Sequence, residues 1–307
     1  MSFVKIKEKE GAHKMMKILV LGGTRFFGKK TVEILIKKGH EVTIATRGNT
    51  EHGFRDQVNH VLLDAQDRNH PGWKEIVDQQ WDAVFDNVCY TKEDAKVLIE
   101  KFTDVAAHLY FTSSMSVYSG AKDGYEEADF DPCTYEIDPT IEVNYGEGKR
   151  QAEQVLFTEA PFPVTSFRFP IVLDNDDYTE RLHYYVEKTV NNETIRFEKS
   201  EVKVNYVKGT TAAESIVWAI ENSKAGIYNV SSKDAVTVST LMGWLEEAVG
   251  EEIDVEYSEK NKSASPFSVS HDQYLISDKI AGEGFELMNL KEWMKPLMQE
   301  LVAKMKN

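Results

Sequence analysis

From residue 16 onward, short apolar runs alternate with longer segments in which apolar residues recur every three or four positions. Short runs bounded by turn residues are typical of buried strands, and the longer pattern is typical of amphipathic helices. We expect strands at 17–21, 41–45, 60–63, 83–85, 108–112 and 163–169, with helices at 27–38, 73–79, 92–101 and 145–158. This alternation predicts an α/β fold with a doubly wound parallel sheet.

Beyond residue 170 the rhythm becomes less regular. We expect helices at 179–190, 212–222, 239–249 and 290–304, and strands at 195–197, 202–207 and 227–230. The interpretation is a dinucleotide-binding domain at 16–170 and a smaller α/β substrate domain at 171–307, partly interleaved with the first sheet. Residues 1–15 lack the apolar segment of a secretory signal, so we expect a flexible leader there.

Composition narrows the class of protein. The 307 residues are 41% hydrophobic and 28% charged, which is typical of a globular protein, and no apolar run approaches the ~18 residues of a membrane span. The net charge of −15 argues against nucleic-acid binding, because that binding needs cations to neutralise phosphates. Cys89 and Cys133 form no disulfide framework, and the scattered histidines predict no metal site. We therefore expect a cytoplasmic protein without membrane or metal, and leave open a homodimer.

A glycine-rich segment directly follows the first expected strand. It reads Gly22-Gly23-Thr24-Arg25-Phe26-Phe27-Gly28. Glycines between a strand and a helix allow a tight turn and a close approach of backbone, and the helix amino end attracts phosphates. The segment predicts a nicotinamide dinucleotide site, in which Arg25 replaces a more usual glycine and could fold over a phosphate.

The end of the second strand bears on the choice of cofactor. NAD sites usually place a carboxylate there for the ribose hydroxyls, whereas this chain has Thr46-Arg47-Gly48. Arg47 suits a 2′-phosphate, so we expect NADP in preference to NAD, although a solvated surface arginine is the alternative. Asp64 is either a partner of the adenine amine or an ordinary loop acid.

Tyr145 and Lys149 are spaced to share one face of a helix. A phenol that titrates near 10 needs roughly 4 kcal/mol of preferential stabilisation to act as a base near neutral pH, which an ammonium and a cofactor's positive ring could supply. Ser114 is expected to bind the same substrate oxygen, with Ser113 and Ser116 as alternatives. Gly146 and Gly148 are poor helix residues, and they indicate either a close ligand or a loose helix start.

With these motifs the chain resembles the extended, atypical short-chain dehydrogenase/reductase family in its NAD-dependent epimerase/dehydratase branch. The resemblance covers residues 17 to the last helix. Within the family, the chain is similar to the subgroup that includes chloroplast stem-loop RNA-binding proteins. It implies a Rossmann-type fold, with Ser114, Tyr145 and Lys149 as the catalytic set. It also implies that Gly22, Gly23 and Gly28 form the cofactor turn, and that Phe169-Pro170 lies against the nicotinamide.

Two departures limit what carries over: the chain has Phe85-Asp86-Asn87-Val88-Cys89 after the fourth strand, where the family usually has a small-residue turn, and it lacks an arginine that grips a diphosphate. No arginine occurs in Val204-Asn205-Tyr206-Val207, where sugar-nucleotide enzymes commonly grip a diphosphate, and Arg181 fits surface charge better than a ligand group. The resulting hypothesis is an NAD(P)-dependent oxidoreductase or epimerase/dehydratase-like enzyme acting on a small hydroxyl or carbonyl compound, sugar-derived or not. The alternatives are an RNA-associated protein or a dinucleotide sensor without turnover.

Overall fold

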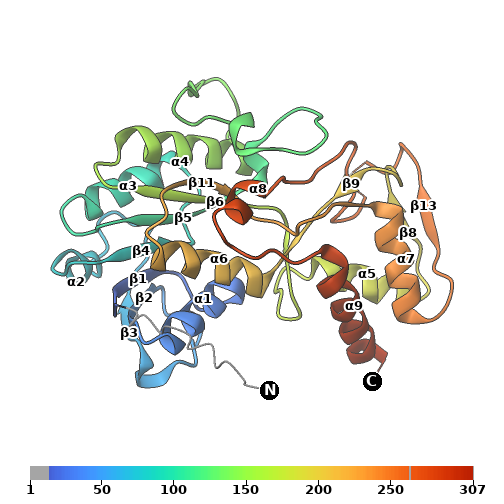
Figure 1. Cartoon of the computed structure of the whole chain (residues 1–307), viewed down its shortest axis with the longest axis horizontal. Coiled ribbons are helices and arrows are strands. Elements are labelled where there is room, and N and C mark those ends of the chain that lie inside the picture. Colours follow the sequence, from blue (N-terminus) through green and yellow to red (C-terminus); the bar gives the residue numbers. More distant parts are fainter. Residues whose placement is uncertain (1–13, 263, 307) are drawn as a thin grey trace, which may run out of the picture.

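Seven parallel strands form the main sheet, in the order β11-β6-β5-β4-β1-β2-β3 (Figure 1). The computed structural model describes residues 14–262 and 264–306, so most of the expected leader lies outside the described residues. The strands are β1 (Lys17–Leu21), β2 (Glu41–Thr46), β3 (Asn59–Leu62), β4 (Ala83–Asp86), β5 (Leu109–Ser114), β6 (Val164–Phe169) and β11 (Gly226–Asn229). The predicted doubly wound sheet is therefore confirmed.

Helices cover both faces of this sheet (Figure 1). On one face α1 (Phe26–Lys37) packs against α6 (Gly209–Glu221), and on the other lie α2 (Trp73–Val77), α3 (Lys92–Phe102) and α4 (Tyr145–Glu159). Strands β1, β4 and β6 are almost entirely buried, as strands of a parallel sheet between two helix layers are expected to be, whereas the edge strand β3 is mostly exposed. Helix α6 and strand β11 come from beyond residue 170, so the proposed domain division is interleaved at this sheet.

A second group of elements lies beside the sheet and has its own apolar core (Figure 1). It contains α5 (Arg181–Val190), α7 (Val238–Val249), α9 (Leu290–Lys306) and the strand pair β8 (Ile195–Phe197) and β13 (Val255–Tyr257). Tyr185 is fully buried there against Phe197 and Phe267, so it packs in the core and does not line a cleft.

Short elements connect these two parts, and several were not expected. The strand expected at 202–207 is wrong as one piece, because it divides into β9 (Lys203–Val204) and β10 (Val207–Lys208). These pair with β12 (Val236–Thr237) and β7 (Val172–Leu173) respectively. Helix α8 (Asp278–Gly282) was also missed. Two- and five-residue elements carry too little periodicity to be found in a sequence.

Parallel registry brings the candidate residues to one edge of the sheet. Strand β5 pairs with β6 as far as Ser114 opposite Phe169, and β1 ends at Leu21 with the glycine turn next. Strand β1 lies between β4 and β2, where the strand order reverses and doubly wound sheets open a crevice. Over the described residues, none of the helices is long and apolar enough to cross a membrane.

Candidate functional site

The glycine turn has the conformation that its residues predict. Gly22 and Gly23 have φ of +98° and +84°, values that side chains disfavour. A Cβ on Gly23 would lie 2.9 Å from the Val20 side chain, and one on Gly28 would lie 2.9 Å from the Asn87 amide nitrogen. The turn is therefore as slim as a site for a close ligand requires.

The first turn of α1 leaves its amide groups open. No side chain caps this end, and no acid occurs in the first turn. Uncapped N–H groups and the helix dipole favour an anion at this position. Arg25 lies beside the turn, where its guanidinium donates to the Thr50 hydroxyl at 3.0 and 3.2 Å and lies over the Tyr178 ring.

A cavity of about 480 Å³ extends from this turn along the carboxyl ends of β1, β2 and β3. The structure brings together in its wall most of the residues predicted to bind cofactor: Gly22, Gly23, Thr24, Arg25, Phe26, Phe27, Arg47 and Asp64. Gly28 packs behind the wall, against Asn87 and Gly23. The shape and lining fit the adenosine and pyrophosphate of a dinucleotide.

A second cavity of about 470 Å³ contains the predicted chemistry. Its wall includes Ser113, Ser114, Tyr145, Lys149, Phe169 and Pro170. The two cavities share the walls formed by Phe26, Phe27, Asn87, Tyr90 and Tyr178. A long ligand that enters by the glycine turn would therefore reach the Ser-Tyr-Lys set.

Lys149 is held firmly in the floor of the second cavity. It is 2% exposed, and its Nζ donates to the carbonyl oxygens of Cys89 at 2.6 Å and Thr112 at 2.7 Å. The ammonium also lies 4.6 Å from the Tyr90 ring centre and 5.9 Å from that of Tyr145. Burial lowers the pKa of Lys149, while nearby negative groups oppose that shift.

Tyr145 lies at the start of α4 with half of its side chain exposed in the cavity. Loss of water around the hydroxyl raises its pKa, although the Ser114 hydroxyl and the charge of Arg181 favour the phenolate. The expectation that the ammonium and a cofactor's positive ring together make this phenol acidic stays a prediction, because the chain alone supplies only the first of the two. Lys149 donates to two carbonyls, and its Nζ lies 5.9 Å from the centre of the Tyr145 ring.

Gly146 and Gly148 have a structural reason that the sequence did not show. A Cβ on Gly146 would lie 2.5 Å from the Ser116 carbonyl oxygen, and one on Gly148 would lie 2.6 Å from that of Tyr90. The two glycines let α4 approach two neighbouring backbones, which brings Tyr145 to Ser114. This packing is a sufficient reason for both glycines, and the close approach of a ligand stays a prediction.

Asp86 lies behind the site, and the sequence motifs did not indicate its role. It is 1% exposed at the end of β4, and one carboxylate oxygen accepts from the backbone N–H groups of Val88 at 3.1 Å and Cys89 at 2.7 Å. The other oxygen has no hydrogen-bond partner among the described residues. Since the Cys89 carbonyl accepts from Lys149, Asp86 fixes the turn that holds the ammonium. The feature of the sequence that could have indicated this role is an acidic residue at the end of an apolar strand.

Asp86→Asn should change how stability depends on pH. Burial raises the pKa of Asp86 from 3.8 to about 6. Between these values the native state binds a proton that the unfolded state has released, so the wild type loses stability as the pH rises through this window. The unfolding free energy of the variant relative to wild type should increase by about 2 kcal/mol from about pH 4 to about pH 7. Urea unfolding at each pH measures this, and a pH-independent difference would contradict it.

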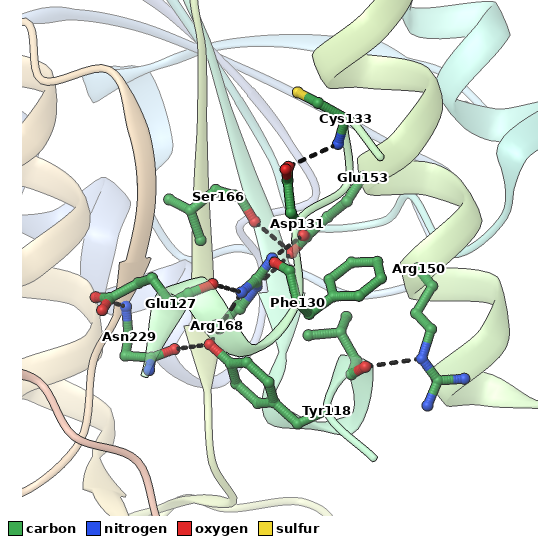
Figure 2. A network of polar contacts seen from close by, with 12 residues as sticks. Tyr118, Glu127, Phe130, Asp131, Cys133, Arg150, Glu153, Ser166, Arg168 and Asn229 are labelled. Carbon is green, nitrogen blue, oxygen red and sulfur yellow. Dashed lines mark hydrogen bonds and ion pairs between the residues drawn. The ribbon is translucent and has the colours of Figure 1, made fainter. Parts of the chain in front are cut away.

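The acidic stretch after Ser114 is anchored more firmly than a solvated lid (Figure 2). Arg168 of β6 donates to the carbonyl oxygens of Glu127 at 3.0 Å and Phe130 at 2.9 Å. It also donates to the Tyr118 hydroxyl at 2.9 Å and forms an ion pair with Glu153 at 2.6 Å. This network fixes the inward side of the segment 123–131 to strand β6.

Arg181 is the second residue whose position the sequence did not predict. The interpretation as surface charge is incomplete, because the side chain is exposed but lines the second cavity. Helix α5 begins at Arg181, two residues later than expected, and its preceding residue Glu180 has a left-handed backbone. Among the described residues, no group of histidine, cysteine and acidic side chains could hold a metal ion.

Comparison with known proteins gives one family match and one curated relative. Residues 18–96 match the NAD dependent epimerase/dehydratase family. The chain is 25% identical over 279 residues to the chloroplast stem-loop binding protein of 41 kDa b from Arabidopsis thaliana, covering 83% of this chain and 71% of the relative.

Solved structures extend the likeness over nearly the whole chain. UDP-glucose 4-epimerase from Thermotoga maritima, solved with UDP-glucose, aligns with a TM-score of 0.72 at 20% identity, covering 95% of this chain and 100% of the other. UDP-glucuronic acid 4-epimerase from Bacillus cereus, solved with NAD, aligns with a TM-score of 0.72 at 14% identity and the same coverage. At these identities the likeness shows the fold. The predicted resemblance is thus confirmed: residues 18–96 carry the NAD dependent epimerase/dehydratase signature, on a fold shared with sugar-nucleotide epimerases.

Proposed function

We propose that this protein is an NAD(P)-dependent enzyme of the epimerase, dehydratase or reductase type. The observation that carries the proposal is the junction of the two cavities, where the walls of the glycine-turn cavity continue into the cavity of Ser114, Tyr145 and Lys149. The family match over residues 18–96 supports the same conclusion. When bound, a nicotinamide dinucleotide supplies a site that accepts or returns a hydride.

The residues of the first cavity fit this group. The uncapped end of α1 offers N–H groups to phosphates, and a side chain on Gly23 would meet Val20 within the turn. Lys149 uses two of its three N–H donors on carbonyls, and the third has no acceptor among the described residues. That donor is available to a ligand in the cavity.

Tyr145 and Ser114 are proposed to handle the proton. The Ser114 hydroxyl, which also contacts the Ser116 hydroxyl at 3.1 Å, lies close enough to Tyr145 to favour its phenolate. A substrate hydroxyl between the two would donate its proton to Tyr145 during oxidation, and the same phenol would return it during reduction. The Nζ of buried Lys149 lies 5.9 Å from the centre of the Tyr145 ring.

Fluorescence titration with NADH and NADPH tests the cofactor part of the proposal. Purified protein should bind at least one reduced cofactor at micromolar concentration, and Tyr145→Phe should bind it equally well while losing turnover. Failure of wild type to bind either cofactor at millimolar concentration would remove the proposal. Unchanged biological activity of Tyr145→Phe with intact binding would favour a sensor over an enzyme.

We further propose NADP as the preferred cofactor, and Arg47 as the reason. Arg47 lines the first cavity at the end of β2, and Asp64 at the end of β3 is the single carboxylate in that described wall. Arg47→Gln should weaken NADPH binding about tenfold and leave NADH binding nearly unchanged, because a guanidinium–phosphate contact is lost. Arg196→Gln, whose side chain pairs with exposed Glu256, is the matched control. Equal losses for both cofactors would contradict NADP preference.

A second candidate function follows from the curated relative, whose name records stem-loop binding. The net charge of −15 opposes this function, since each phosphate contact needs a cation. A mobility-shift assay with structured RNA at physiological ionic strength distinguishes the two. A salt-dependent shift would revive RNA binding, and no shift would close it.

A further inference from the structure

The second cavity has an unusual charge for this chain. The protein carries 51 acidic and 36 basic residues, yet none of the described residues that line this cavity is acidic. The lining contains two cations, Lys149 and Arg181. Lys149 already donates to two carbonyl oxygens from the cavity floor. Arg181 has neither an ion pair nor a hydrogen bond within the described part of the chain.

Arg181 and Tyr145 face the same space. Arg181 is the first residue of α5 and enters from the second group of elements, whereas Tyr145 begins α4 beside the main sheet. The charge of Arg181 reaches the Tyr145 hydroxyl and favours its phenolate. A molecule that contacts Tyr145 therefore lies within the field of an unpaired guanidinium.

We propose that the substrate carries one compact anionic group, a carboxylate or a phosphomonoester, which Arg181 binds while Ser114 and Tyr145 hold the reacting oxygen. This inference rests on the proposed function and specifies its substrate class. A guanidinium pairs with either anion through two parallel N–H donors. The other described residues of the lining, among them Val204, Phe267 and Val269, include no further cation for a nucleotide diphosphate.

Four related probes test the proposal: D-glucose, D-glucuronate, D-glucose 6-phosphate and UDP-glucose. The protein is first saturated with the reduced cofactor that it binds. Each probe is then titrated in, and the change in cofactor fluorescence reports binding of the probe. We expect glucuronate or glucose 6-phosphate to bind at least about tenfold more tightly than glucose, because a charge-assisted pair is gained. We expect the same margin over UDP-glucose, because its diphosphate and uridine meet no further cation in the lining. The stronger of the two identifies the anion as carboxylate or phosphomonoester.

Variants separate this proposal from the proposed function. Arg181→Gln should remove the preference over glucose, Arg181→Lys should keep part of it, and Arg196→Gln should keep all of it. Four results would overturn the inference. They are a preference that survives in Arg181→Gln, tightest binding by UDP-glucose, equal binding of glucose and both anions, and no binding by any probe. Loss of cofactor binding itself would count against the proposed function instead.

Discussion

Arg168→Met is expected to lower the unfolding free energy by about 3–5 kcal/mol, because it leaves a buried carboxylate without its partner. Arg168 and Glu153 both have side chains with no exposed surface, and their closest contact is 2.6 Å. Removing the guanidinium also leaves the carbonyl oxygens of Glu127 and Phe130 without these donors. Urea unfolding followed by circular dichroism measures the loss.

Two matched variants show whether the buried charge is the cause. Arg196→Met removes an exposed pair with Glu256 and should cost less than about 1 kcal/mol. Glu153→Gln combined with Arg168→Met removes both charges and should recover part of the loss. A cost for Arg168→Met no larger than that for Arg196→Met would show that the network (Figure 2) contributes little to stability.

The sequence allowed the sheet and its edge to be predicted because both depend on strong local patterns. Apolar runs separated by helical periodicity indicated six of the seven strands in sequence order, and the seventh was expected at 227–230. Parallel strands end at a common edge, so the residues that follow β1, β2, β3 and β5 were expected near one another. The lining of the first cavity agrees with that reasoning.

The remaining site residues could not be predicted because tertiary contacts decide their roles. Nothing in the local sequence indicates that the Asp86 carboxylate accepts from the N–H of Cys89, or that the Cys89 carbonyl accepts from Lys149. Arg181 follows a loop in which Asp176 forms an ion pair with Lys30 of α1 at 2.8 Å. Contacts between residues so far apart in sequence leave no periodic signal.

The same distinction between local preference and packing applies to three glycine-to-alanine changes. We expect one of them to raise the free energy of unfolding and two to lower it. Within a helix, alanine is favoured over glycine by up to about 1 kcal/mol. Gly243 lies in α7 with nothing within 4 Å of an added Cβ, so Gly243→Ala should stabilise the protein by about 0.5–1 kcal/mol.

Gly146→Ala and Gly148→Ala should destabilise the protein instead, by about 1–2 kcal/mol after the helix preference is subtracted. Each added Cβ would meet a backbone oxygen, at 2.5 Å for Ser116 and 2.6 Å for Tyr90, and a backbone cannot rotate away as a flexible side chain can. Urea unfolding of all three variants compares the signs directly. Stabilisation by all three would mean that α4 can move away from these loops at little cost, and the close approach that brings Tyr145 to Ser114 would then not depend on glycine.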